Sequence, residues 1–357
     1  MHNQLWSDIQ AEGANLQHVV EHLYTTERAQ IEQAAAFLRN ERPLALIGVA
    51  SAAYVCMPAE IYLGQRGRSA SVISASDALY SLLPALKESN VVINTRSGET
   101  VEVVKLGQAL HEQGIPFVAI TNEPGSRLAS LATHVVWADT HKDDLVSINV
   151  VTGMMTATLV LAAAVTGELD SLRPAFERLA GEMGGVVARA AGQAGVLRDL
   201  LGGLRPLYLL YRGHSKGAAY CGRLVLEEVS RTPAIAMESA EFRQGPNEVI
   251  DERFGAVVFA PEGKQGELNL ALANDILRCG GRVLLVGSLA ADALGDAPGS
   301  LVFPIPAVGD ALSPVLAVAP VQVLAYELAK AQGFTPGEVR YITKVILSEE
   351  GIPNQVR

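Results

Sequence analysis

A group of side chains suited to binding an anion lies in the segment Asn90–Thr100, which has the sequence NVVINTRSGET. Its first six residues have the pattern of a buried strand, and a helical pattern follows Thr100 and ends at Gly114. The N-terminus of a helix that follows a strand presents unpaired backbone N–H groups and the positive end of the helix dipole. This spacing predicts a loop that can hold an anionic group.

The side chains of this loop favour phosphate as the anion. Thr95, Ser97 and Thr100 supply hydroxyl donors, and Gly98 lets the backbone approach a ligand closely. Arg96 adds a cation whose forked donors match phosphate oxygens. The alternative is a plain helix cap, in which Ser97 and Thr100 only start the helix.

A second hydroxyl loop favours the anion site over the plain cap. The stretch Ile47–Ser51 follows another predicted strand and opens another helix. Ligands of open α/β sheets bind at the carboxyl ends of the strands, so Ser51 is expected to point into the same crevice.

The second half of the chain offers ionisable groups in place of hydroxyl groups. Its corresponding loop, Pro261–Lys264, has no hydroxyl cluster, whereas acids and bases are found in Arg212–Lys216, Leu226–Glu228 and Glu241–Pro246. We therefore expect one half to bind the anion and the other half to supply acid and base groups.

These loops need a framework of parallel strands, and the sequence contains the same plan twice. Aliphatic runs alternate with helical runs, which is typical of parallel sheets covered on both faces. The runs begin at Leu44, Ser69, Asn90, Phe117 and His134 in the first half, and at Leu207, Ala234, Ala256, Arg282 and Leu301 in the second half. The matched spacing predicts an α/β fold of two tandem three-layer α/β/α sandwiches, each with a parallel five-stranded sheet. The alternative is one doubly wound sheet of ten strands, which is long for an open sheet.

The predicted elements divide the chain into three parts. Residues 1–40 form an N-terminal helical segment, 41–185 the first sandwich, and 186–357 the second sandwich with a C-terminal helical tail. The main helix of the tail is expected to open at Pro320 and to close at Gly333, followed by a short extended end.

Composition and charge limit the classes of function. Of 357 residues, 49% are apolar and 18% are charged, which is enough for a large core. The net charge of −10 without a basic run opposes nucleic acid and anionic membranes as partners. The apolar stretch Ile148–Val165 is predicted as a buried core helix, because it is short and dotted with polar residues for a membrane span.

Cysteine usage and the N-terminus indicate a cytoplasmic protein. The three cysteines form no paired motif, and residues 1–13 lack the pattern of a signal peptide. His18 and His22 lie one helical turn apart without a third ligand, so no metal site is predicted.

Four motifs, in the same order along the chain, resemble those of the sugar isomerase (SIS) family, specifically of its two-domain, flavodoxin-like members. SGET at Ser97–Thr100 resembles the phosphate loop, GRLVLEE at Gly222–Glu228 resembles the GALKLKE helix, and EFRQGP at Glu241–Pro246 is similar to the E-[LF]-[KR]-HGP segment. VRYITKV near the C-terminus resembles the RNLAKSV tail. The resemblance covers nearly the whole chain after about Arg42. The two-domain members of the family that the chain resembles include the isomerase half of glucosamine-6-phosphate synthase and related deaminases and deglycases.

The resemblance implies a role for each matching residue. Phosphate is expected on Thr95, Ser97 and Thr100, with Ser51 nearby. Glu228 matches the carboxylate that moves a proton between sugar carbons one and two, and Lys344 matches the tail lysine that assists ring opening. Without the motifs, Glu228 and Lys344 are ordinary surface charges. The family usually forms dimers whose sites take residues from both subunits, and its chemistry needs no cofactor.

The chain departs from the family pattern at several positions. Gln244 occupies the place of the ring-opening histidine, and glutamine cannot shuttle a proton. Val225 and Glu227 replace two lysines beside Glu228, and Arg96 replaces the usual glutamine of the phosphate loop. His214 just past a strand end is a candidate substitute for the missing histidine, although a histidine there can also be a satisfied loop residue.

Two classes of function therefore remain open from the sequence. The first is an enzyme that isomerises a sugar phosphate, or that deaminates or deglycates an amino-sugar phosphate, through ring opening and proton transfer by Glu228. The second is a sugar-phosphate sensor or regulatory subunit without turnover, which Gln244 supports. A segment matching a glutamine amidotransferase is not found, so synthesis of glucosamine from glutamine is not expected.

Overall fold

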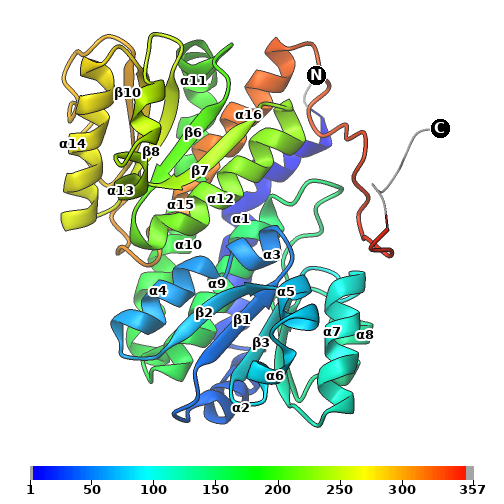
Figure 1. The fold of residues 1–357 in the computed structure, drawn as a ribbon. Helices are drawn as coiled ribbons and strands as arrows, with labels where there is room; N and C mark the ends of the chain where they lie inside the picture. The colour runs from blue at the N-terminus through cyan, green and yellow to red at the C-terminus, as the bar shows by residue number, and fades with distance from the viewer. Residues whose placement is uncertain (1–2, 351–357) are drawn as a thin grey trace. The chain divides into compact units, whose positions relative to one another are not determined.

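A computed structural model describes residues 3–350 of the chain (Figure 1). The chain divides into two compact units, each built around one parallel sheet. The β1–β5 unit comprises residues 14–180 and 339–350, and the β6–β10 unit comprises residues 3–13 and 181–338. The assignment of functional domains to residues 41–185 and 186–357 stays a prediction.

Five parallel strands in the order β2-β1-β3-β4-β5 form the first sheet. They are β1 (Leu44–Gly48), β2 (Ala70–Ser74), β3 (Asn90–Thr95), β4 (Phe117–Thr121) and β5 (His134–Trp137). All residues of β1, β3 and β4 are buried, which explains why their sequences are continuous aliphatic runs. The strand order reverses between β1 and β3, where ligands of such sheets bind.

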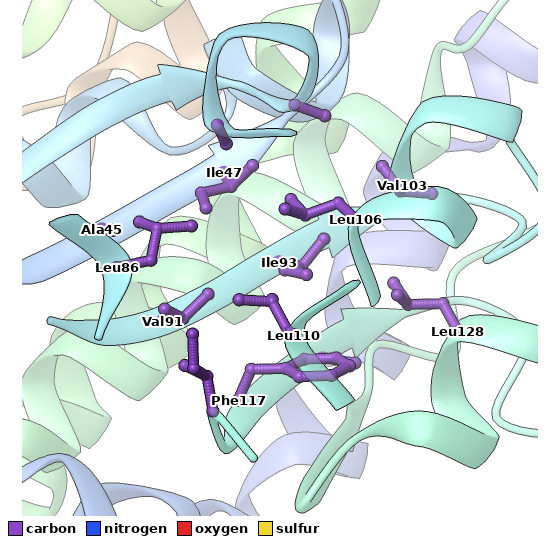
Figure 2. Close-up of a cluster of buried hydrophobic side chains, with 14 residues drawn as sticks. Ala45, Ile47, Leu86, Val91, Ile93, Val103, Leu106, Leu110, Phe117 and Leu128 are labelled. Atoms are coloured by element: carbon purple, nitrogen blue, oxygen red, sulfur yellow. The ribbon is translucent and has the colours of Figure 1, made fainter. Parts of the chain in front are cut away.

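Helices cover both faces of this sheet. They are α2 (Arg28–Leu38), α3 (Ser51–Tyr54), α4 (Met57–Gln65), α5 (Ala75–Tyr80), α6 (Leu83–Leu86), α7 (Val101–Glu112), α8 (Arg127–Leu131) and α9 (Asn149–Val165). On one face, Ile93 and Phe117 pack against Leu106 and Leu110 of α7 (Figure 2). On the other face lies α9, all of whose residues are buried, so the predicted core helix is confirmed.

The second sheet repeats the strand order of the first, as β10-β9-β8-β6-β7. Its strands are β6 (Leu207–Tyr211), β7 (Ala234–Glu238), β8 (Gly255–Ala260), β9 (Arg282–Gly287) and β10 (Ser300–Pro304). The predicted α/β fold with two parallel five-stranded sheets is confirmed, and the alternative of one ten-stranded sheet is wrong.

The helical elements of the β6–β10 unit surround this sheet. They are α11 (Ala194–Leu201), η1 (Gly213–Ser215), α12 (Lys216–Val225), η2 (Leu226–Ser230), α13 (Ser239–Phe242), η3 (Pro246–Val249), α14 (Lys264–Arg278), α15 (Ser313–Ala317) and α16 (Ala319–Ala331). Two further helices, α1 (Gln4–Tyr24) and α10 (Leu169–Gly192), have residues in both units. A buried cluster around Phe242, Phe254 and Ile276 fills one face of the sheet.

The C-terminal helical region begins earlier than the sequence suggested. A short helix, α15, precedes α16, and each has a proline in its first turn, Pro314 and Pro320. Proline is favoured in the first turn of a helix, so Pro314 marks the start of α15, which the sequence patterns did not predict, whereas α16 begins at Ala319, next to the predicted Pro320. Gly333, with a φ of +78°, follows the end of α16 as expected.

One helical stretch among residues 3–350, Ser313–Ala331, is long and apolar enough to cross a membrane by length and composition alone. Of its most apolar window, 89% is buried inside the fold, as in the core helix of a folded protein.

Candidate functional site

The loop between β3 and α7 is folded by its own hydroxyl groups. The Gly98 N–H donates to Thr95 Oγ1 at 3.2 Å, and the Glu99 N–H donates to Ser97 Oγ at 3.2 Å. Thr100 occupies the N-cap position of α7, but its side chain makes no capping hydrogen bond. The Thr100 hydroxyl therefore does not cap α7. The hydroxyl groups of Thr95 and Ser97 instead accept backbone hydrogen bonds in the turn that precedes the helix.

Gly98 is the residue that lets this loop lie close to α8. Its φ is +63°, and a Cβ atom at this position would lie 1.9 Å from Ser126 Oγ. Ser126 is the N-cap of α8, where its hydroxyl accepts a hydrogen bond from the Ala129 N–H. Only glycine fits both the backbone conformation and the space.

A cavity of about 510 Å³ opens beside this loop. Its lining combines the loop, the ends of β4 and β5, and the C-terminal tail: Arg96, Ser97, Glu99, Asn122, Glu123, Gly125, Ser126, Lys142, Lys344 and Val345. The structure thus brings together three residues that the sequence singled out, Arg96, Ser97 and Lys344. Ser51 and Arg96 line a much smaller neighbouring cavity of about 10 Å³.

Two lysines and Arg96 bring positive charge to the cavity lining. Lys142 Nζ pairs with Glu123 Oε1 at 2.7 Å. Within residues 3–350, no ion pair or hydrogen bond involves the Lys344 side chain. Lys344 is therefore the cation best placed to meet an anionic or carbonyl-bearing ligand in the cavity.

Arg96 is used differently from the sequence expectation. Its guanidinium donates to the backbone carbonyls of Asp143 and Asp144, the latter at 3.0 Å, and to Ser147 Oγ at 3.3 Å. The forked donors thus hold the segment that leads from β5 to α9. The side chain still lines the cavity, so its charge acts on a ligand while its geometry shapes the wall.

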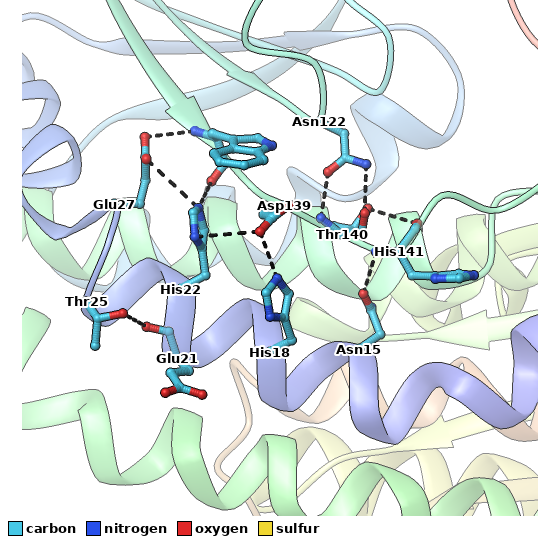
Figure 3. A network of polar contacts seen from close by, with 11 residues as sticks. Asn15, His18, Glu21, His22, Thr25, Glu27, Asn122, Asp139, Thr140 and His141 are labelled. Carbon is cyan, nitrogen blue, oxygen red and sulfur yellow. Dashed lines mark hydrogen bonds and ion pairs between the residues drawn. The ribbon is translucent and has the colours of Figure 1, made fainter.

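A polar network behind the cavity fixes the segment that carries Lys142 (Figure 3). Asn122 Nδ2 donates to the Thr140 carbonyl at 3.0 Å, and the Thr140 N–H donates to Asn122 Oδ1 at 2.6 Å. The His141 N–H donates to Asn15 Oδ1 at 2.7 Å. These bonds tie Asn122, a cavity residue, to α1.

The same network provides polar partners for His18 and His22, the two histidines of α1. His18 Nε2 lies 2.8 Å from Asp139 Oδ2, and His22 Nε2 lies 3.1 Å from the Trp137 carbonyl (Figure 3). Among the described residues, no group of three or more histidine, cysteine, aspartate or glutamate side chains is arranged to hold a metal ion.

The C-terminal tail is fastened beside the cavity at two points. The Ile346 carbonyl accepts a hydrogen bond from the Val101 N–H, the first residue of α7, at 3.0 Å. Glu349 accepts from the Tyr80 hydroxyl at 2.8 Å and forms an ion pair with Lys105. We call Tyr80, Lys105 and Glu349 the tail clasp. Sequence reasoning missed it, because its members are 25 to 269 positions apart.

The remaining candidates lie in the β6–β10 unit. Glu228 is half-buried in η2, a short π-helical turn at the end of α12 that stops where Arg231 adopts a φ of +53°. Such turns are rare and are found mostly at functional sites. Gln244 is exposed in the turn after α13. His214 is buried just past β6, and its Nδ1 lies 2.9 Å from Asp310 Oδ2.

Glu228 lies far from the other two candidates within one chain. Helix α12 and η2 separate His214 from Glu228 by 14 residues, or about 20 Å at the helical rise. Gln244 follows the carboxyl end of β7, whereas η2 precedes the amino end of that strand. The structure therefore places Glu228 and Gln244 at opposite ends of the same sheet.

Parallel sheets of this order, with a cavity lined by hydroxyl groups and lysines at the strand ends, are typical of the class of α/β proteins that bind ligands at the carboxyl ends of their strands. Residues 37–164 match the family model "SIS domain". This match covers about a third of the chain, which is similar to SIS domains over these residues.

Proteins with similar sequences agree with this family match. The chain is 27% identical over 331 residues to glutamine–fructose-6-phosphate aminotransferase (isomerizing) of Pyrobaculum aerophilum, which covers 90% of this chain and 54% of that protein. The same enzyme of Aquifex aeolicus is 27% identical over 288 residues, which is 79% of this chain and 48% of that protein. The chain spans about half the length of the curated relatives it matches.

Solved structures share the fold. The C-terminal domain of glucosamine-fructose-6-phosphate aminotransferase from Francisella tularensis gives a TM-score of 0.81 at 19% identity, over 94% of this chain and 98% of that one. Tagatose-6-phosphate ketose/aldose isomerase from Escherichia coli gives 0.78 at 18% identity, over 94% of both chains. Glucosamine-6-phosphate deaminase from Thermotoga maritima gives 0.75 at 19% identity, over 96% and 99%. At these identities the likeness concerns the fold.

Proposed function

We propose that this chain is a cytoplasmic enzyme that acts on a phosphorylated sugar, as an aldose–ketose isomerase or as a related amino-sugar-phosphate deaminase or deglycase. The observation that carries the proposal is the cavity lined by both Ser97 of the β3–α7 loop and Lys344, whose side chain has no ion pair or hydrogen bond within residues 3–350. Relatives named for fructose 6-phosphate and a neighbour named for tagatose 6-phosphate support a sugar phosphate as the substrate.

The proposal assigns phosphate binding to the β1–β5 unit. Thr95, Ser97 and Thr100 supply hydroxyl donors at the loop, with Ser51 at the neighbouring cavity. Arg96 contributes positive charge and holds the wall, because its donors are engaged by carbonyl groups. The helix dipole of α7 adds favourable potential at the loop.

Proton transfer is assigned to Glu228. After the sugar ring opens, the Glu228 carboxylate removes the proton from the carbon next to the carbonyl, which leaves an enediolate. The same carboxyl group returns the proton to the neighbouring carbon, while a hydroxyl proton moves from the oxygen of the new carbonyl to the oxygen of the old one, so the reaction is balanced without a cofactor. Lys344 assists ring opening, and Gln244 orients the sugar by hydrogen bonds, since it cannot carry a proton.

The positions of Glu228 and Gln244 support a homodimer as the working form. One sugar cannot contact both side chains of one chain, because they lie at opposite ends of the β6–β10 sheet. If both contact the substrate, Gln244 comes from a second copy. In that arrangement, either Gln244 or His214 of the second copy takes the place of the family's ring-opening histidine.

Deuterium exchange tests the proposal directly. The protein is incubated in heavy water with fructose 6-phosphate, glucose 6-phosphate or glucosamine 6-phosphate, and the sugars are followed by proton NMR. Deuterium at carbon one or two is expected for at least one substrate. Glu228→Gln should lower the exchange rate by at least 100-fold, whereas the neighbouring Glu227→Gln should leave it within about twofold.

The second candidate is a sugar-phosphate sensor, which Gln244 favours because it removes the proton carrier of the family. The same experiment separates the two. Line broadening of the sugar signals without deuterium incorporation establishes binding without turnover. Neither broadening nor exchange for any of the three sugars contradicts both candidates for these substrates.

A further inference from the structure

The carboxyl edge of the β6–β10 sheet holds buried polar atoms, of which the proposed reaction involves only His214, and that residue only as the alternative to Gln244. They lie just past the strand ends: His214 Nε2 after β6, Gln265 Oε1 after β8, Ser288 Oγ after β9, and Asp310 Oδ1 in the loop after β10. Within the part of the chain that the structure describes, none of these atoms has a hydrogen-bond partner. Buried polar atoms in folded proteins are nearly always paired, so this group indicates a place where another molecule supplies the bonds.

His214 and Asp310 form an oriented pair within this group. The His214 side chain is 1% exposed, and its Nδ1 lies 2.9 Å from Asp310 Oδ2. A carboxylate oxygen only accepts hydrogen bonds, so the pair keeps a proton on Nδ1 and makes Nε2 of the neutral imidazole an acceptor. The ring is thus held with an acceptor atom directed away from Asp310.

The sheet topology gathers these atoms at one place. Strands β8 and β9 lie between β6 and β10, yet Asp310 after β10 contacts His214 after β6. The segment 305–310 therefore crosses the carboxyl ends of β8 and β9, from which Gln265 and Ser288 follow. A Cβ atom at Gly213, the neighbour of His214, would lie 2.0 Å from Gln265 Oε1, so this amide packs directly against the His214 loop.

The chemistry of the edge selects the ligand. Three of the four atoms are acceptors, and the Ser288 hydroxyl can act in either direction. Two cations that flank the edge are already engaged, Arg212 by Glu238 at 3.2 Å and by Asn269 at 3.1 Å, and Lys264 by Glu267 at 3.1 Å. The remaining carboxylate of Asp310 opposes an anion and attracts a cation or a hydroxyl group.

We propose that this edge is a second binding site, for a small non-anionic molecule rich in hydroxyl or amino donors, such as an unphosphorylated sugar or amino sugar. It is independent of the phosphate loop, which lies in the β1–β5 unit. Within one chain it is also distinct from the proton-transfer carboxylate, since about 20 Å of helix separates His214 from Glu228.

Ligand-observed saturation-transfer NMR on the full chain tests this site with D-glucosamine, sorbitol and inorganic phosphate as separate probes. Glucosamine should bind more tightly than sorbitol, because its ammonium group meets the Asp310 carboxylate. Asp310→Asn and Ser288→Ala should each weaken glucosamine binding about tenfold and leave phosphate binding unchanged. Ser97→Ala should do the reverse.

Three outcomes overturn the proposal. Absence of glucosamine and sorbitol binding at millimolar concentration means that water alone satisfies the buried atoms. Glucosamine binding that is lost in Ser97→Ala but kept in Ser288→Ala assigns it to the phosphate loop. Loss of sugar-phosphate deuterium exchange in Asp310→Asn, with glucosamine binding intact, assigns the His214 pair to the reaction. The melting temperature of each variant is measured alongside, and Ser288→Ala tests the site should Asp310→Asn fail to fold.

Discussion

Gly98 shows how one residue can control the geometry of the whole β3–α7 loop, to which we assign phosphate binding. Its left-handed backbone turns the chain between β3 and α7, and its missing side chain leaves room for the Ser126 hydroxyl. Since Ser126 also caps α8, the loop and a second helix depend on the same small space. Loss of this space should therefore affect both stability and binding.

Gly98→Ala should destabilise the protein by about 2–4 kcal/mol, because the strained φ adds to the clash with Ser126 and the loss of its cap. The matched control is Gly114→Ala, which has a similar φ of +67° but no atom within 4 Å of the added Cβ. It should cost only about 1 kcal/mol. Urea unfolding of both variants measures the difference, and equal losses contradict the role given to Ser126.

Part of the site could be predicted from residue types and part could not. Ser97 and Lys344 match family motifs, and the structure brings them into one cavity. Lys142 and Asn122 follow β5 and β4, and the rule that ligands bind at strand ends could have found them. The engagement of Arg96 by the carbonyl groups of residues 143 and 144 could not be foreseen, because it depends on the path of a loop.

At the scale of elements, the tail clasp links the C-terminal tail to the phosphate loop. Glu349 holds the tail to α5 and α7, and Lys344 lies five residues before it in the cavity wall. The ion pair with Lys105 lowers the pKa of Glu349, and Glu349 raises the pKa values of Lys105 and Tyr80. The clasp is thus formed by a charged glutamate, a charged lysine and a protonated tyrosine.

The clasp should make ligand binding depend on pH in a defined direction. Because the pKa of Glu349 is lowered on folding, its contribution is complete above the ordinary glutamate value and is lost as the pH falls through the lowered value. Because the pKa of Lys105 is raised, its contribution is complete below the ordinary lysine value and is lost as the pH rises through the raised one. The tail should therefore stay fastened from about pH 5 to pH 10.

Glu349→Gln should release the tail and weaken fructose 6-phosphate binding three- to tenfold at pH 7, because Lys344 loses its fixed position. The part of the wild-type affinity that is lost as the pH falls below the ordinary glutamate pKa toward the lowered pKa of Glu349 should be absent from this variant. Isothermal titration at several pH values measures both effects. Glu350→Gln is the matched control, since Glu350 is exposed and only its backbone N–H bonds Ser348 Oγ. An unchanged affinity in Glu349→Gln rules out the positioning role of the clasp.

The strands were the most predictable elements and the connections the least. Buried parallel strands are continuous aliphatic runs, so all ten start within one residue of the predicted positions. The helix α15 was missed, because its five residues are too few to show a helical period and only Pro314 signals its start. The π-helical turn at Glu228 has no sequence signature. It continues α12 without a break and ends at Arg231, which adopts a left-handed conformation.

At the scale of the whole molecule, the separation of Glu228 from Gln244 makes the proposed dimer testable. If each active site takes Glu228 from one copy and Gln244 from the other, a heterodimer of two different single variants contains one site with both defects and one intact site. Symmetry of a two-fold dimer requires this distribution. A site built within one chain gives no intact combination.

Co-expression of Glu228→Gln and Gln244→Ala chains should therefore restore about a quarter of the wild-type exchange rate, because half of the randomly paired dimers carry one intact site of two. Each variant expressed alone should fall at least tenfold below the wild type, and equal total protein concentrations make the comparison direct. Different affinity tags on the two chains allow the heterodimer to be isolated, where recovery should rise to about half. If the isolated heterodimer is as inactive as the two single-variant proteins, Glu228 and Gln244 do not share a site across two copies. A wild-type protein that sediments as a monomer leads to the same conclusion without the co-expression experiment.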